Sequence, residues 1–483
     1  MIDWLVKRYH FLFIAFFVII NGYLIYTGRT PLIGIGLAAI LIIIYTAFFH
    51  LDKLFWLVVF FTPISISLED YGEFGIGVSL PTEPFLLGIL TLIFVRSLYY
   101  KTNTKISTHP ISIAVILYLS IIFLTSLSSS NPLVSLKFLL AKMWLIIPAF
   151  YFGAKLFEKK NNIYRFLIIY TIPFAFVVIY TLIRHASMGF EEDPGHWVMQ
   201  PFFKDHTSYG AIIAMFLPTV VAFYFINKKN SLLRSGFIVL LIVFLIGLYF
   251  SYTRAAWLSM IFGVAVFCII YFRVKFKILS IIALLAGVFV IMNWNEIQYQ
   301  LSKNDAEHTT EEFGERIQSM SNISTDASNL ERLNRWNCAI EMFKERPVLG
   351  WGPGTYMFEY TSFQQSKDLT IISTNFSDGG NAHSEYLSAL SESGVIGLAA
   401  FLILVATIFY KGITLYSIVE DKELKIILSA VIVGLSTYFV HGILNNYLDS
   451  DKAAIPVWGF AGIIVAIDIF HKNRQLNKAV SSK

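Results

Sequence analysis

The chain has 483 residues, of which 56% are hydrophobic and only 14% are charged, and its formal net charge is +5. Soluble domains carry about 25% charged residues, whereas the apolar residues here form blocks of about 17–22, long enough to cross about 30 Å of hydrocarbon as helices. Water-soluble fold classes are therefore excluded, and so is a membrane β-barrel, whose segments are short and alternating. The composition predicts an all-α polytopic membrane protein.

Fourteen membrane spans are predicted in chain order. They cover residues 11–27, 31–49, 54–68, 84–100, 110–127, 136–154, 163–183, 207–226, 232–250, 255–272, 276–292, 395–410, 425–444 and 453–470. Since short apolar blocks can be re-entrant, the expected total is about 12–14 transmembrane helices. This divides the chain into an N-terminal bundle of about eleven spans (1–292), an outer loop domain (293–382) and a C-terminal bundle of about three spans (383–483).

Lysine and arginine residues favour one orientation of this bundle. With the N-terminus inside, 23 of the 37 Lys and Arg residues fall on the inner side, which is the asymmetry of the positive-inside rule. Both termini are therefore expected in the cytoplasm, with the long loop outside. The first apolar block follows Lys7 and Arg8 without a small-residue cleavage site, so no cleavable signal peptide is expected.

Cofactor chemistry has no signal in the sequence. Cys268 lies in a predicted span and Cys338 in the loop, so the two are not expected to pair, and they form no zinc-binding cluster. No Walker motif indicates ATP. We predict no metal, no cofactor and no nucleic-acid partner.

The long polar loop is predicted to be folded rather than a linker. A capping-box pattern joins Thr309 to Glu312. A stronger helix is predicted over NLERLNRWNCAIEMFKERP, with an apolar stripe at helical spacing made of Leu333, Trp336, Ile340 and Phe343. Pro347 should end this helix, and the glycines of GWGPG impose a tight turn. A structured outer loop on a membrane bundle indicates a site at the membrane surface.

Arg254, in the stretch SYTRAAW, needs an anionic partner. Between His206 and Glu296 the sequence contains no Asp or Glu, and an arginine costs about 2.5–3.5 kcal/mol at the bilayer centre and less near its edge. One interpretation is that the side chain reaches lipid phosphates. The other is that it binds a substrate phosphate, whose oxygens suit the planar guanidinium.

Arg332 and Arg335 lie about one helical turn apart in the predicted loop helix. Arg332 shares a helix face with Trp336 at i+4. Its guanidinium can either bind a phosphate or pair with a carboxylate of the loop, and the sequence leaves both interpretations open. For Arg335 we favour pairing with a nearby acid such as Glu331, although substrate binding by Arg335 and Trp336 is kept as a candidate.

His383 lies in GGNAHSEYL, where the loop returns to the membrane. Asn381 is a good N-cap residue, which predicts that His383 occupies the first helical turn. The positive helix end disfavours imidazolium and would keep His383 neutral and able to accept a proton. His383 is then either a general base or an interfacial histidine without chemistry.

Other outer polar residues are weaker candidates for substrate binding. Asp205 and His206 precede a predicted span and can simply be interfacial. His441 and Asn445 lie at i, i+4 on one helix face and can line a cavity. No carboxylate–histidine spacing supports a metal site here.

Taken together, three stretches resemble the O-antigen ligase and polymerase family. They are SYTRAAW, ERLNRWNCAIEMFKERPVLGWGPGTY and NAHSEYLSALSESGVIGLAAF. The family pattern falls on Arg254; on Arg332 with Trp336; on Pro347, Gly350 and Gly352; on His383; and on Glu392, Gly394 and Gly397. The likeness covers about residues 248–405. Relatives often have His-Asn at His383-Ser384 and Ser-Arg-Gly at Thr253-Arg254-Ala255, which leaves the subfamily open.

The resemblance implies a GT-C-like, metal-independent, inverting glycosyltransferase of the bacterial inner membrane with its large loop in the periplasm. Such a protein takes a glycan from a polyprenyl (undecaprenyl) pyrophosphate carrier and passes it to lipid A–core, as a ligase, or to another lipid-linked repeat, as a polymerase. His383 would then assist the acceptor hydroxyl, while Arg254 and Arg332 hold the pyrophosphate.

A transporter of lipid-linked glycan is the alternative from another class. It would require charged residues within the spans and broken helices in two matching halves. The polar candidates here are predicted to gather outside the spans, which favours the transferase.

Overall fold

The structure, a computed structural model, describes residues 49–68, 78–99, 104–274, 327–365 and 380–481, with the single residues 19, 46, 285, 288, 292 and 293. For 327–330 and 474–481 only the backbone is described. The predicted spans 11–27, 31–49 and 276–292 lie outside these ranges except at single positions, as does the predicted capping box.

Ten described helices are long and apolar enough to cross a membrane. They are α4 (Thr82–Tyr99), α6 (Pro110–Leu127), α7 to α8 (Pro132–Phe157), α9 (Lys160–Ala186), α11 (His206–Ile226), α12 (Ser231–Tyr249), α13 (Arg254–Tyr271), α19 (Glu385–Ile418), α20 (Lys422–His441) and Asp451–Asn473 of α21 (Asp451–Ser481). Each overlaps one predicted span, so ten of the fourteen are confirmed.

The other helical elements are short or lie in the loop. They are α3 (Leu51–Phe61), the 3-10 turn η1 (Thr62–Ile64), α5 (Thr104–Ser107), α10 (Glu192–Gly195), α17 (Ala327–Glu345), α18 (Tyr356–Glu359) and the 3-10 turn η4 (Tyr360–Phe363). Within the third span, α7 (Pro132–Ile146), the π-helical segment η3 (Ile147–Phe152) and α8 (Gly153–Phe157) follow one another directly.

The span predicted at 54–68 is wrong. Helix α3 has only 11 residues, which reach about 16 Å, and Pro63 then stands in η1. Strand β1 (Ile66–Ser67) follows and pairs antiparallel with β2 (Ser79–Leu80). Polar contacts explain the turn, because Ser65 Oγ donates to Asp451 at 2.5 Å and the buried Lys452 donates to Ser65 O at 2.7 Å.

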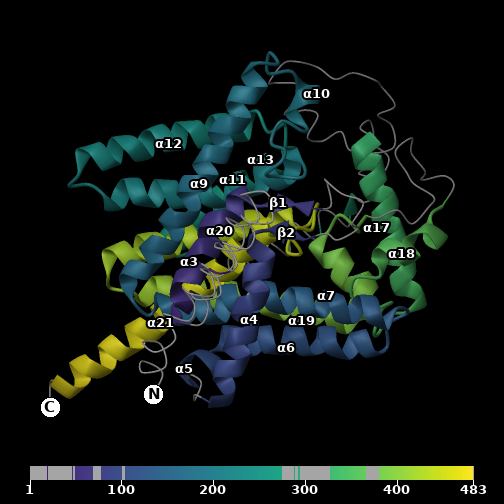
Figure 1. Cartoon of the computed structure of the whole chain (residues 1–483), viewed down its shortest axis with the longest axis horizontal. Helices are drawn as coiled ribbons and strands as arrows, with labels where there is room; N and C mark the ends of the chain where they lie inside the picture. Colours follow the sequence, from purple (N-terminus) through teal and green to yellow (C-terminus); the bar gives the residue numbers. More distant parts are fainter. Residues whose placement is uncertain are drawn as a thin grey trace.

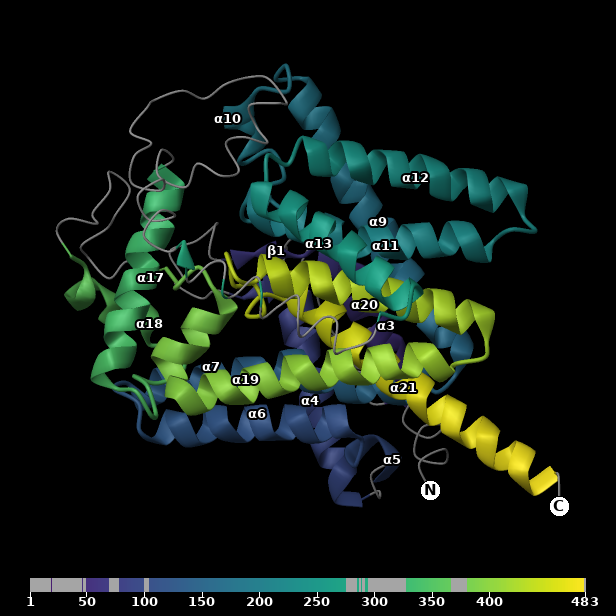
Figure 2. The ribbon, with the colours of Figure 1, turned by 180° about the vertical axis from the view of Figure 1, so that it is seen from behind.

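Helices α6, α7, α11, α12, α19 and α20 run side by side, whereas α4 and α9 cross them, and most of the connections gather at two opposite ends (Figures 1 and 2). One end carries α17, α18, α10 and the β1–β2 hairpin, and is called here the α17 end. The opposite end carries the α11–α12 and α19–α20 turns and the C-terminus (Figure 1). The helix starts of α11, α13 and α19 therefore meet at the α17 end.

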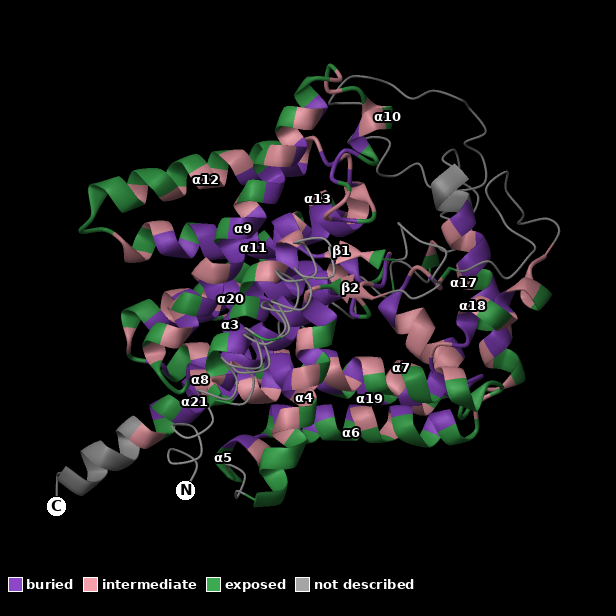
Figure 3. Ribbon diagram, viewed as in Figure 1, coloured by how far each residue is buried: buried purple, intermediate pink, exposed green. Residues whose placement is uncertain are grey.

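Burial identifies the centre of the bundle. In α21, 94% of the spanning window is buried, against 17% in α12. Figure 3 shows the same contrast, with α20 and α21 largely buried and α12 largely exposed. Leu232, Val239 and Ile242 are among the exposed apolar side chains of α12, the composition of a surface that faces lipid. The central helices thus support the site, and the outer ones face the membrane.

Helix α17 buries a different face from the one predicted. The stripe residue Ile340 is 38% exposed, and Leu333, Trp336 and Phe343 are only half-buried. The buried face instead carries Glu331, Asn334, Arg335, Cys338, Ala339 and Met342, which also follow helical spacing. The small residues let α17 approach Trp351, Tyr356 and Ala382, and its polar residues face the segment before α19.

The glycine turn after α17 docks on a break in α19. Gly350, Gly352 and Gly354 all have positive φ, as the sequence predicted. Gly352 N donates to Glu392 O at 2.7 Å, and Gly394 interrupts α19 with φ 66°. A Cβ on Gly394 would lie 2.2 Å from Val348 O. The two glycine motifs therefore fit one another and fix α17 against α19.

Candidate functional site

His383 lies two residues before α19, in a strained backbone conformation. Its φ is +46°, in the left-handed region that few side chains adopt. Asn381 Oδ1 accepts a hydrogen bond from His383 N at 2.9 Å, and Ser384 Oγ accepts from Leu387 N at 3.3 Å. The N-cap is thus Ser384, not Asn381 as predicted, because Asn381 turns its side chain back onto its own loop. His383 lies just outside the helix.

Helix α17 holds this loop from the other side. Arg335 Nη1 donates to Asn381 O at 3.4 Å, and Trp336 Nε1 donates to His383 O at 3.4 Å. Arg335 Nε also donates to Glu331 Oε1 at 2.7 Å in a buried ion pair. The predicted pairing of Arg335 is confirmed, and both α17 side chains position the backbone around His383.

The surroundings of His383 keep its imidazole neutral. Burial, then the positive charges of Arg335 and Arg332, lower the pKa of His383 to about 4, while Asp205 and Glu331 oppose that shift. At neutral pH the imidazole therefore carries a proton on only one of its two ring nitrogens. The structure thus brings Arg332 and Asp205 near His383 from distant parts of the chain.

Asp205 belongs to a hydrogen-bonded group at the start of α11. Its Oδ1 caps the helix by accepting from Ser208 N at 2.7 Å, and it accepts from Thr207 Oγ1 at 2.6 Å. Tyr447 OH donates to the same oxygen at 3.4 Å and also hydrogen-bonds Thr207. Burial and the Asp205 charge raise the pKa of Tyr447 well above 10. Tyr447 therefore remains a hydrogen-bond donor.

His441 and His206 complete the same cluster. His441 ends α20 and is 1% exposed, and Asn445 Nδ2 lies 3.1 Å from its Nε2, so the predicted i, i+4 pair is in contact. Arg332, Asp205 and His206 all interact electrostatically with His441. These candidates, scattered over 240 residues of sequence, meet at the α17 end.

Arg254 borders this cluster on a neighbouring helix. It is half-buried and forms the first residue of α13 after the N-cap Thr253. The Thr253 hydroxyl donates to His206 O at 2.8 Å, which ties the start of α13 to the start of α11. Arg254 is thus connected to the cluster through Thr253 and His206.

Sequence reasoning missed the buried carboxylate Glu385. Its Oε1 accepts from Tyr438 OH at 2.8 Å and from the backbone N–H groups of Tyr447 and Leu448 at 2.8 and 2.9 Å. These bonds fix the 442–450 loop against the start of α19. An acidic residue in a first helical turn was the available signal. For Tyr447, a single aromatic residue in a loop, the sequence carried none.

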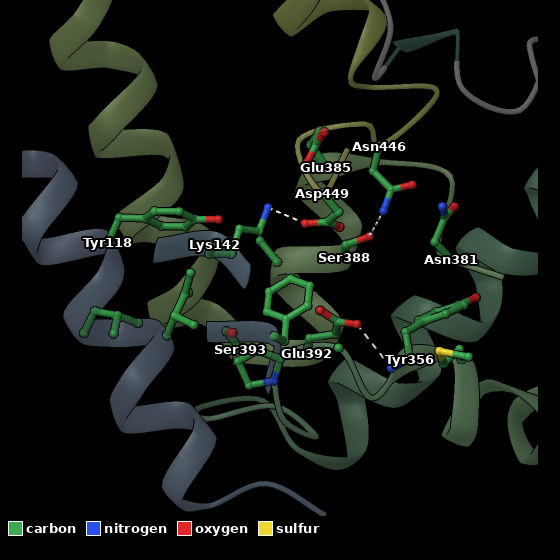
Figure 4. Close-up of a pocket in the computed structure, with 18 of the residues that line it drawn as sticks. Tyr118, Lys142, Tyr356, Asn381, Glu385, Ser388, Glu392, Ser393, Asn446 and Asp449 are labelled. Carbon is green, nitrogen blue, oxygen red and sulfur yellow. Dashed lines mark hydrogen bonds and ion pairs between the residues drawn. The ribbon is translucent and has the colours of Figure 1, made fainter. Parts of the chain in front are cut away.

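A cavity of about 200 Å³ lies next to the loop that carries His383. Figure 4 shows Asn381, Glu385, Ser388, Glu392, Asn446 and Asp449 around it, facing Tyr118 and Lys142 from α6 and α7. Lys142 is 3% exposed and pairs with Asp449 at 2.5 Å. A lysine within an apolar span was a readable signal for a polar site. Lys142 also shows that polar groups lie within the spans, contrary to the prediction that they gather outside them.

Metal binding has no support in the described ranges, where no group of three His, Cys, Asp or Glu side chains is arranged to hold an ion. What the cluster offers instead is a neutral imidazole beside guanidinium groups. This combination can accept a proton from a hydroxyl while holding a negatively charged group.

Comparison with known proteins finds a family likeness over part of the chain. Residues 239–402 match the family model described as O-antigen ligase. An uncharacterized protein of Haemophilus influenzae is 24% identical over 262 residues, which make up 52% of this chain and 61% of that relative. The chain thus spans about three fifths of that relative. The matched region contains Arg254, Arg332 and His383, and through this region the chain is similar to the family of O-antigen ligases and polymerases.

Proposed function

We propose that the protein transfers a glycan from a polyprenyl (undecaprenyl) pyrophosphate carrier to an acceptor hydroxyl at the outer face of the bacterial inner membrane. The matched family is described as O-antigen ligase, and lipid A–core is the acceptor proposed here for such a ligase. Transfer to a second lipid-linked repeat, as a polymerase, uses the same chemistry. The fold proposed for this activity is GT-C-like, without a metal or cofactor.

One observation carries the proposal: the half-buried, neutral imidazole of His383 lies beside the positive charges of Arg332 and Arg335. A proton acceptor next to an anion-binding group is what glycan transfer from a pyrophosphate needs. Arg335 and Arg332 add to the lowering of the His383 pKa, whereas Asp205 and Glu331 oppose it.

The proposed step forms one bond to the anomeric carbon and breaks another bond to the same carbon. The acceptor oxygen attacks the anomeric carbon, and the bond from that carbon to the pyrophosphate oxygen breaks with inversion. His383 takes the proton from the acceptor hydroxyl, and the departing pyrophosphate keeps the electron pair. Arg332 and Arg254 stabilise its developing negative charge, which is the usual work of guanidinium groups in phosphate chemistry. Asp205, His206 and His441 bind and orient the sugars.

Donor binding would strengthen His383 as a base. In the free protein Arg335 and Arg332 help to lower the pKa of His383. A bound pyrophosphate would place negative charges against these guanidinium groups and raise the pKa of His383 toward its ordinary range. Proton transfer would then be favoured only when the donor is present.

The proposed orientation puts the α17 end in the periplasm and both termini in the cytoplasm. Lys228 and Lys229, in the α11–α12 turn, and Lys472 near the end of α21 belong to the opposite end, which the positive-inside rule assigns to the cytoplasm. Lipid-linked glycan and membrane lipids would then meet the site from the outer leaflet.

Gene deletion, followed by complementation with His383→Ala, tests this function. Loss of long chains from lipid A–core, with long chains kept on the carrier lipid, indicates a ligase. A single repeat on the core indicates a polymerase. Normal surface glycan in a well-expressed His383→Ala strain would refute both. Movement of lipid-linked glycan across vesicles by purified protein, without a new glycosidic bond, would establish the transporter instead.

A further inference from the structure

The segment 381–385 has two different sides. On one side His383 interacts with the positive charge of Arg332. On the other side Asn381 and Glu385, two residues away in each direction, line the cavity of about 200 Å³. A substrate bound in the cavity would therefore lie beside the segment that carries His383, on the side of Asn381 and Glu385, and Arg335 contacts the same segment at Asn381 O.

The segment 445–447 separates the same two regions. Asn445 Nδ2 lies 3.1 Å from His441 Nε2, and Tyr447 donates to the carboxylate that caps α11. Between them, Asn446 turns toward the cavity, where its Nδ2 donates to Ser388 Oγ at 3.4 Å (Figure 4). Two loops thus form a common wall between the cavity and the histidine–arginine cluster.

The polar groups in the cavity do not favour an anion. Glu385, Glu392 and Asp449 line it, and Lys142 is their only cationic counterpart among the lining residues. Because Lys142 already pairs with Asp449, the lining offers a pyrophosphate no further cation. A free cation would compete with Lys142, which already pairs with Asp449 at 2.5 Å. The cavity therefore suits a neutral polar group.

An unused hydrogen-bonding atom points to what that group is. Asn446 is 9% exposed, and its Oδ1 has no hydrogen-bond partner among the described residues. Turning the amide over would leave its nitrogen in that position, so one polar atom is unsatisfied either way. Buried polar atoms are rarely left unpaired in proteins. A hydroxyl, which both donates and accepts, satisfies either arrangement.

The size and walls of the cavity suit one ring. Sites for drug-sized ligands measure about 300–1,000 Å³, so a cavity of about 200 Å³ holds a smaller group. Tyr118 and Phe138 add aromatic side chains to the lining, and polar groups together with aromatic surface are typical of small-molecule sites. Building on the proposed function, we infer that this cavity binds one neutral, hydroxyl-rich sugar ring of the acceptor glycan.

Binding of soluble glycans to the full-length protein in lipid nanodiscs tests the inference. Two probes are used: core oligosaccharide released by mild acid from lipopolysaccharide that lacks O-antigen, and the repeat oligosaccharide released from the carrier lipid. Asn446→Leu keeps the side-chain size but removes the amide. Its matched control is Asn131→Leu, at an exposed amide that caps α7.

Asn446→Leu is expected to weaken binding of one of the two probes about three- to tenfold, the loss of one hydrogen bond, with Asn131→Leu unchanged. Ala389→Phe, which fills the cavity from α19, should abolish that binding. Affinity for polyprenyl pyrophosphate should stay the same in all variants. The inference is overturned if wild type and Asn446→Leu bind both probes equally well, or if wild type binds neither probe. It is also overturned if the variants lose only the binding of polyprenyl pyrophosphate.

The transfer assay keeps the two proposals apart. Wild-type protein that binds a probe through Asn446 but forms no glycosidic bond would refute the proposed function and leave the sugar site standing. Wild-type protein that transfers glycan while Asn446→Leu and Ala389→Phe keep their acceptor KM would refute the sugar site and leave the transferase standing.

Discussion

Arg335 pairs with Glu331 through Nε at 2.7 Å and, through Nη1, donates to the carbonyl oxygen of Asn381 at 3.4 Å. One guanidinium thus links a helix of the outer loop to the segment that presents His383. Gly380 allows this approach, because a Cβ there would lie 1.8 Å from Arg335 Nη1. Arg332, three residues earlier on α17, interacts with His383 electrostatically. The two arginines therefore have different expected roles.

Arg335→Ala should destabilise the protein, whereas Arg332→Ala should mainly remove activity. Removing Arg335 breaks its buried ion pair with Glu331, a change that costs about 3–5 kcal/mol. Thermal unfolding in detergent measures the first effect and glycan transfer the second. The double variant Glu331→Gln, Arg335→Met should recover part of the stability. A stable Arg335→Ala protein, or an unfolded Arg332→Ala protein, would contradict this division.

The pH dependence of transfer should report the lowered pKa of His383. Because only the neutral imidazole accepts a proton, kcat/KM should stay constant as pH falls through 6.5 and drop only near pH 4, the value for the free protein. If the donor raises this pKa, kcat should fall at a higher pH than kcat/KM. Steady-state kinetics from pH 3.5 to about 8 measures both limbs. If kcat and kcat/KM both fell near pH 6.5, the half-buried, cation-flanked setting of His383 would be contradicted.

Asp205→Asn should lower activity without unfolding the protein. Asn caps a helix about as well as Asp, so α11 should keep its start. The lost negative charge, however, no longer opposes the arginines, and the pKa of His383 should fall further below its present value. We expect kcat to fall and the acid limb of kcat/KM to move to lower pH. Asp421→Asn is the control, since Asp421 caps α20 at the other end of the bundle.

Ser384→Asn should be tolerated, and Ser384→Ala should not. Ser384 Oγ caps α19 by accepting from Leu387 N, and Asn is an equally good cap, whereas Ala costs about 1 kcal/mol. This explains how His-Asn in relatives and His383-Ser384 here can serve one purpose. Melting temperature and transfer rate together test it. Equal stability of Ser384→Ala and wild type would show that the cap is unimportant.

Gly394→Ala should separate the outer loop from the bundle. The added Cβ would meet Val348 O at 2.2 Å, and φ is +66°, so both the contact and the backbone are strained. Since Gly352 N bonds Glu392 O beside this break, the position of α17 should change as well. Faster proteolysis within 294–382 is the expected readout. Gly236→Ala, in open space on α12, should leave the cleavage pattern unchanged.

The sequence alone determined the membrane class, because apolar blocks long enough to cross a bilayer are a one-dimensional property. It also indicated the chemical candidates, since Arg254, Arg332 and His383 are of types that bind phosphate or move protons. The failures were local. Residues 54–68 were apolar enough for a span, but contacts to Asp451 and Lys452, far along the chain, set a turn there.

Only the tertiary structure decided which polar residues act together. Asp205, Arg332, His383 and His441 are linked through space by charge and hydrogen bonds that no spacing in the chain encodes. It also decided which face of α17 is buried, because that helix packs both on the apolar side chains of Trp351, Tyr356 and Ala382 and on the polar loop before α19. Lys142 and Asn446 line one cavity only because α7 and the 442–450 loop meet at α19. Local preference selects helices and caps, whereas a site depends on which helix ends the packing brings together.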